Sequence, residues 1–108
     1  MFLKRLLIRL LSIIGGVKYP MMCVVGCTAA TGSVASNGNK VVTATVPVPE
    51  GFTYVGNLGH YTSNSWFTHN RTYRQNETTA TAYVRNTASS SQSATIYFYC
   101  LCIRSEYL

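Results

Sequence analysis

Apolar and polar residues alternate along most of this chain from about residue 23 onward, and this alternation predicts β-strands. The pattern is clearest in 79–87, where Ala80, Ala82 and Val84 fall on one face of an extended segment. Five further segments carry strand-forming residues bounded by turn residues, namely 23–36, 40–46, 52–61, 66–73 and 93–104. About six short strands predict an all-β domain over residues 21–108, folded as an antiparallel β-sandwich or a jelly-roll-like domain.

The last predicted strand, 93–104, is apolar on both of its faces. One face carries Ala94, Ile96, Phe98, Cys100 and Cys102, and the other carries Tyr97, Tyr99, Leu101 and Ile103. Because an antiparallel sheet in a small domain needs only one apolar face against the core, the second face requires another cover. Copies of the chain or its own N-terminal segment would supply it. We therefore expect an oligomer interface formed by Tyr97, Tyr99, Leu101 and Ile103.

Turn residues divide the predicted strands. Asn37-Gly38 predicts a hairpin turn of type I′, in which both central residues have positive φ. Pro47 and Pro49 are expected to end the second strand, because proline cannot donate a hydrogen bond to its neighbour. The strand over 52–61 is expected to bend or bulge at its two glycines, Gly56 and Gly59.

Residues 1–14 carry apolar residues at helical spacing opposite a basic arc, which predicts a short amphipathic helix ahead of the β domain. We interpret 1–20 as an arm that docks on a larger protein or packs on its own domain, with the anchors Leu3, Leu7, Leu10 and Ile14. One alternative is a helix that lies on a membrane surface. Another is a cleaved signal peptide, although its apolar core would be interrupted by Arg9, Lys18 and Pro20.

Acidic and basic groups suited to catalysis are scarce. The chain has no Asp, and its only acids, Glu50, Glu77 and Glu106, fall in predicted turns or near the C-terminus. A Ser-His-Asp triad therefore cannot be built. The net charge of +6 is concentrated early, with four of the nine Lys and Arg residues in the first eighteen positions. Because the later arginines are not clustered with aromatic residues, we predict no nucleic-acid partner, and no enzymatic activity, cofactor or metal.

Four cysteines occur in two closely spaced pairs, Cys23 with Cys27 and Cys100 with Cys102. Cross-strand disulfides would require the first and last strands to be neighbours. A four-thiolate zinc site is the second interpretation, but the usual two-residue spacing is missing. The third, which we favour, is that the cysteines are small buried apolar side chains. The spacing fixes neither their redox state nor their pairing.

An aromatic group in the middle of the chain is the best candidate for a recognition surface. Tyr61, Trp66 and Tyr73 are the predicted contacts for a host glycan or protein, although packing in a core or interface is the favoured role of such rings. Since neighbouring strand residues face opposite ways, at most one of Trp66 and Phe67 is expected in the same core. His60 and His69 could meet on facing strands and bind a metal together with a cysteine, but the favoured interpretation is that they are polar histidines on the surface or in loops.

The segment Val46-Pro-Val-Pro-Glu-Gly-Phe-Thr-Tyr-Val-Gly-Asn-Leu-Gly59 resembles a segment of small β modules in virion proteins of tailed bacteriophages. Val84-Arg-Asn-Thr87, the serine-rich turn after it and the apolar-aromatic last strand are also similar to those modules. The resemblance covers roughly residues 28–104. It implies a structural homotrimer exposed on a virion, able to contact a host surface. The chain departs from the family in lacking a long upstream fibre part.

These observations predict a head or tail decoration or fibre protein that forms a homo-oligomer, with a trimer favoured, and is held to the virion by its N-terminal arm. The alternative is a bacterial secreted or lipid-anchored surface protein with a β-sandwich binding domain. Its basis is Val24-Val25-Gly26-Cys27, which is similar to a lipoprotein cleavage site.

Overall fold

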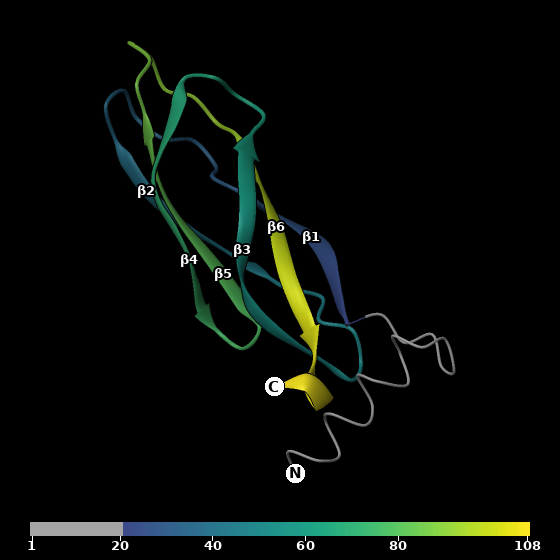
Figure 1. Ribbon diagram of the computed structural model, residues 1–108. Coiled ribbons are helices and arrows are strands. Elements are labelled where there is room, and N and C mark those ends of the chain that lie inside the picture. The colour runs from purple at the N-terminus through teal and green to yellow at the C-terminus, as the bar shows by residue number, and fades with distance from the viewer. Residues whose placement is uncertain (1–20) are drawn as a thin grey trace.

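The computed structural model describes residues 21–108, which form two three-stranded antiparallel sheets packed face to face (Figure 1). The β6 sheet has the order β1 (Met22–Ala30), β6 (Thr95–Arg104) and β3 (Phe52–Thr62). The β5 sheet has the order β2 (Asn39–Thr45), β5 (Thr79–Asn86) and β4 (Phe67–Asn76). A short 3-10 turn, Ser105–Tyr107, follows β6. The predicted six-stranded antiparallel fold is confirmed.

The predictions made for the N-terminal arm lie outside the described residues. They comprise the amphipathic helix over 1–14 and the four anchors Leu3, Leu7, Leu10 and Ile14.

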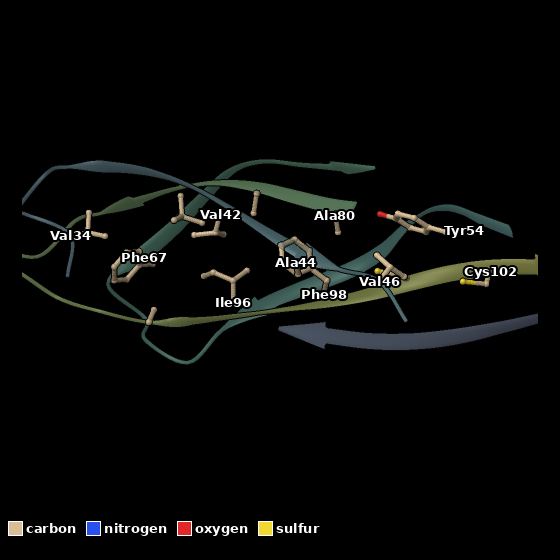
Figure 2. Packing of buried hydrophobic residues seen from close by; sticks show 14 residues of the cluster. Val34, Val42, Ala44, Val46, Tyr54, Phe67, Ala80, Ile96, Phe98 and Cys102 are labelled. Carbon is tan, nitrogen blue, oxygen red and sulfur yellow. The ribbon is translucent and has the colours of Figure 1, made fainter. Parts of the chain in front are cut away.

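The core lies between the two sheets and combines large side chains from one with small ones from the other (Figure 2). The β6 sheet contributes Tyr54, Ile96 and Phe98, and the last two are completely buried. Alanines on β2 and β5 face this side of the core and leave room for the larger residues: Ala44, Ala80 and Ala82. Phe67 is 4% exposed whereas Trp66 is 53% exposed, so the expectation that only one of the two enters the core is confirmed.

β6 is the central strand of its sheet, with β1 on one side and β3 on the other. Its pairing with β1 is regular along the whole length of β1, from Met22 opposite Ile103 to Ala30 opposite Thr95. Its pairing with β3 is interrupted twice, between Tyr54 and Gly56 and again between Asn57 and Gly59. These bulges lie at the two glycines where a bend was predicted, and they allow β3 to twist around β6.

The predicted hairpin at Asn37-Gly38 is wrong. The strands on either side of it, β1 and β2, belong to different sheets, so the turn carries the chain across the sandwich. Asn37 has φ 60°, and Gly38 N–H donates to the Ala35 carbonyl at 2.8 Å, which is a turn with one left-handed residue rather than two. Glycine is required because a Cβ at this position would lie 2.9 Å from the Ala35 oxygen.

A buried asparagine ties together the connections at this end of the sandwich. Asn86 is fully buried, and its Nδ2 donates to the carbonyls of Val34 and Ser90, both at 2.9 Å. Its Oδ1 accepts from the Ala88 N–H at 2.9 Å. These bonds satisfy backbone groups that would otherwise be buried without partners, and they link the crossing segment to the loop after β5.

Candidate interaction surface

The outer face of the β6 sheet is apolar and open to solvent. Register places Met22 beside Ile103 and Val24 beside Leu101, so β1 and β6 form continuous apolar rows. Met22 is 58% exposed, Val24 55% and Tyr99 43%. We call this surface the apolar face, and it consists of Met22, Val24, Tyr61, Tyr97, Tyr99, Leu101 and Ile103. Val55 and Leu58, at the two bulges of β3, are also exposed.

Three tyrosines are arranged in a stack on the apolar face. The rings of Tyr61 and Tyr97 are nearly parallel, at 6°, with centroids 4.4 Å apart, and the Tyr99 centroid lies 6.4 Å from that of Tyr61. Tyr99 pairs with Gly26 on one side and Gly59 on the other, and a Cβ at Gly59 would lie 3.9 Å from its ring. Desolvation by its neighbours raises the pKa of Tyr61. The three tyrosines therefore form one aromatic cluster that spans β3 and β6.

Charge is nearly absent from this sheet. Across β1, β3 and β6 the sequence contains one Lys, Arg, Asp or Glu residue, Arg104, at the last position of β6. Three strands of this length span roughly 33 Å by 14 Å, or about 450 Å² in projection. The apolar part of this area is within the range found for the largest patch on an ordinary monomer, so its size alone does not mark an interface. The centres of interfaces are depleted of charged residues, and the composition of the apolar face fits that criterion.

The structure places the predicted interface residues together but separates the predicted ligand residues. Tyr97, Tyr99, Leu101 and Ile103 all lie on the apolar face. Tyr61 lies there too, whereas Tyr73 is on β4, stacked on Tyr83 with centroids 6.0 Å apart. Trp66 lies in the connection between β3 and β4. The three residues predicted to contact one ligand therefore do not form one site. Sequence reasoning missed Met22 and Val24, because their contribution depends on the pairing of β1 with β6.

The outer face of the β5 sheet has a different chemistry. Arg71 lies over the Tyr73 ring, with its guanidinium carbon 4.5 Å from the centroid, and 6.0 Å from the centroid of Tyr83. Tyr83 itself is 36% exposed. The remaining exposed or half-exposed outward residues of β2 and β5 are mostly polar, namely Thr43, Thr45, Thr79 and Arg85, with Val41 as the exception. Thr81 has the same orientation but is covered, and its hydroxyl donates to Gln75 Oε1. This face is suited to contact with water.

His60 and His69 meet between the facing edge strands β3 and β4, as the less favoured interpretation required. Their ring centroids are 4.0 Å apart, and His60 Nδ1 lies 3.2 Å from the Thr72 hydroxyl. Burial, and then the neighbouring His60, lower the pKa of His69. His69 Nε2 and Asn57 Nδ2 are the buried side-chain polar atoms without a partner among residues 21–108.

A shallow groove of about 370 Å³ opens beside the histidine pair, lined by Asn57, Leu58, Gly59, His60, Thr72 and Tyr73. No third His, Cys, Asp or Glu joins the two histidines as a metal ligand set in the part of the chain that the structure describes. The groove therefore offers hydrogen-bonding groups and the ring of Tyr73.

No protein-family model, curated protein or solved structure significantly matches this chain. Within residues 21–108, none of the helical structure is long and apolar enough to cross a membrane.

Proposed function

We propose that this chain is a non-enzymatic structural subunit that associates with copies of itself through the apolar face. The observation that carries the proposal is a solvent-open sheet surface made of aliphatic residues and stacked tyrosines, in a sheet with one charged residue at its end. Aromatic side chains give large contact area at low entropic cost, which makes them effective centres of interfaces. The domain is also small, so association would add stability that its own core supplies only in part.

The proposed setting is the virion of a tailed phage, in the head or tail. Support comes from the resemblance of Val46–Gly59 and of the last strand to virion β modules. That resemblance also favours a trimer, held to a larger virion protein by the arm over residues 1–20. Detection of the chain in purified particles by mass spectrometry tests this setting, and its absence from particles that carry its gene would contradict it.

The lipid-anchored alternative conflicts with the strand arrangement. Processing before Cys27 would remove Met22 to Gly26 from β1, a strand of 9 residues that pairs with β6 throughout. Both residues that β1 contributes to the apolar face, Met22 and Val24, would be lost with them. The pairing of β1 therefore favours the unprocessed chain.

A matched pair of variants tests the self-association. Tyr99 and Tyr83 are exposed tyrosines on the central strands of the two sheets, but only Tyr99 lies on the apolar face. Tyr99→Lys should weaken association by at least about thirtyfold, since a central aromatic hot spot contributes about 2 kcal/mol or more. Tyr83→Lys should leave it unchanged.

Light scattering across a concentration series, with circular dichroism to verify folding, measures both effects. A wild-type chain that stays monomeric at high micromolar concentration would refute the proposal. Equal weakening by the two variants would show that the apolar face is not the interface.

A further inference from the structure

Four thiols line the inner side of the β1–β6 pair. Cys23 lies directly opposite Cys102 in the strand register, and Cys27 Sγ is 4.0 Å from Cys100 Sγ. All four are free thiols in this structure. We propose that these residues are a site of oxidative modification at which β1 becomes covalently joined to β6 by two disulfides, Cys23–Cys102 and Cys27–Cys100.

The backbone already holds Cys23 and Cys102 at a distance suited to a disulfide. Residues directly opposite each other in a hydrogen-bonded antiparallel pair have Cα atoms about 5.5 Å apart, near the commonest spacing in disulfides. Cys23 and Cys102 are such a pair, because Arg104 N–H donates to the Met21 carbonyl at 2.8 Å two residues away.

Cys27 and Cys100 are diagonal neighbours. Cys27 lies opposite Phe98 and Cys100 lies opposite Val25, so their side chains lean toward each other along the strands. The 4.0 Å between their sulfurs is about 2 Å longer than a disulfide bond. Diagonal neighbours have Cα atoms about 7–8 Å apart, so closing this gap needs a local shift of the backbone as well as rotation of the half-buried Cys27 side chain. Cys27 lies on the edge strand β1, where such a shift disturbs one neighbouring strand only.

Exposure sets the order of the chemistry. Cys100 and Cys102 are completely buried, whereas Cys23 and Cys27 are half-buried on the edge strand, so an oxidant reaches the β1 thiols first. The Cys27 thiolate attacks a small-molecule disulfide, such as oxidised glutathione, forming a mixed disulfide and releasing one small thiol. The Cys100 thiolate then attacks Cys27 Sγ and releases the second. Two protein thiols lose two electrons and two protons, and the small disulfide gains them. Cys23 and Cys102 react in the same way.

Burial makes this reaction slow at neutral pH. It raises the pKa of Cys27, and it raises the pKa of Cys100 to about 12, so that thiolates are rare. Below these pKa values the rate should rise about tenfold per pH unit, because the thiolate is the attacking species. The chain would remain reduced in a reducing cytosol and become cross-linked slowly in an oxidising medium.

The two disulfides should differ in what they add to stability. Either one closes a long loop, since Cys27 and Cys100 are 73 positions apart, and so restricts the unfolded chain strongly. Once the first is present, the second closes only the short segments between neighbouring cysteines. The first disulfide should therefore raise the Tm by about 10 °C or more, and the second should add only a small further increase.

Thiol counting in the full chain tests the proposal. Protein purified under reducing conditions is incubated with oxidised glutathione at mildly alkaline pH, alkylated in denaturant with N-ethylmaleimide and measured by mass spectrometry. The expected product is a monomer that takes up no alkylating reagent and carries no glutathione. Four alkylated thiols, stable glutathione adducts or bridges between chains would each overturn the proposal.

Single variants establish the pairing. Both β1 cysteines fall in one tryptic peptide, 19–40, and both β6 cysteines in another, 86–104, so the wild-type digest cannot distinguish the pairs. In Cys23→Ala the free thiol should be Cys102, and in Cys27→Ala it should be Cys100. The reverse assignment, or a bridge within one strand, would contradict the proposed pairing. The Tyr99→Lys variant should cross-link at the wild-type rate, which separates this site from the proposed assembly.

Discussion

The outer faces of the β6 and β5 sheets occupy equivalent places in the sandwich but are built from different kinds of residue. Along β6 the outward residues Tyr97, Leu101 and Ile103 are apolar and half-buried. Along β5 the corresponding positions include Tyr83 and Arg85, and Arg71 of β4 lies over the tyrosine pair. Both central strands are apolar on their inner side, as a shared core requires.

The β5 sheet shows that a sheet of this sandwich folds with apolar residues on its inner side only. Its outer side is threonine-rich and charged, yet its inner side packs as tightly as that of its partner, with Ala80 and Ala82 completely buried. The hydrophobicity of the outer residues of β6 therefore exceeds what the fold of residues 21–108 demands. Their surplus hydrophobicity is the physical reason to assign them a role in association.

The first test concerns the inner faces, where the largest effect is expected. Phe98→Ala should lower the free energy of unfolding by about 4 kcal/mol, because a completely buried aromatic ring is replaced by a cavity. Val84→Ala, on the β5 side of the same core, should cost about half as much, since fewer buried atoms are removed. Urea unfolding at one protein concentration measures both. Equal losses would mean that the two sheets contribute alike to the stability of the core. The larger side chains of the β6 sheet would then add no more free energy of unfolding than the smaller ones of the β5 sheet.

The second test makes the outer face of the β5 sheet more apolar, like that of the β6 sheet. Replacing both Arg71→Leu and Arg85→Leu removes the charges that lie over and beside Tyr73 and Tyr83. In the Tyr99→Lys background, the double variant should increase self-association by about tenfold, or about 1.4 kcal/mol. Sedimentation velocity reads out the change, with Thr43→Leu as a control that adds an apolar residue and leaves both charges. No gain from the double variant would mean that charge is not what keeps the β5 sheet free of contacts.

Local features of the fold could be predicted from the sequence because they arise from short-range geometry. Alternation at Ala80, Ala82 and Val84 located β5, and glycines located the bulges of β3. Pairing between distant strands could not be predicted in the same way. β1 and β6 are neighbours although more than sixty residues separate them, and their register decides which residues join Tyr99 on the apolar face. The Asn37-Gly38 prediction failed for this reason, since turn residues specify φ without specifying which strands pair.

The same limit applies to the candidate sites. The outward direction of Tyr97 to Ile103 follows from the period of a strand, so these residues were placed correctly on one face. The contact of His60 with His69 depends on how the edges of two sheets meet, and nine residues of sequence separation carry no information about it. Asn86 was also missed, because an asparagine that ends a strand has the same sequence signature whether its side chain is buried or exposed.

The smallest effect is expected at the edge where the two sheets meet through the histidine pair. Unfolded, His69 titrates near its ordinary pKa of 6.5, and in the folded chain burial and His60 lower that pKa. Between these two pKa values the unfolded chain binds more protons, so acid favours unfolding. This contribution to stability is fully present above pH 6.5, declines as the pH falls below that value, and stops changing below the folded pKa. Urea midpoints of the wild type and His69→Gln across this range should diverge as pH falls, with the wild type showing the steeper loss. If the urea midpoints of the two proteins fall in parallel with pH, His69 does not contribute to the pH dependence. The edge between β3 and β4 would then be open to water, and the two sheets would be joined more loosely there than along the core.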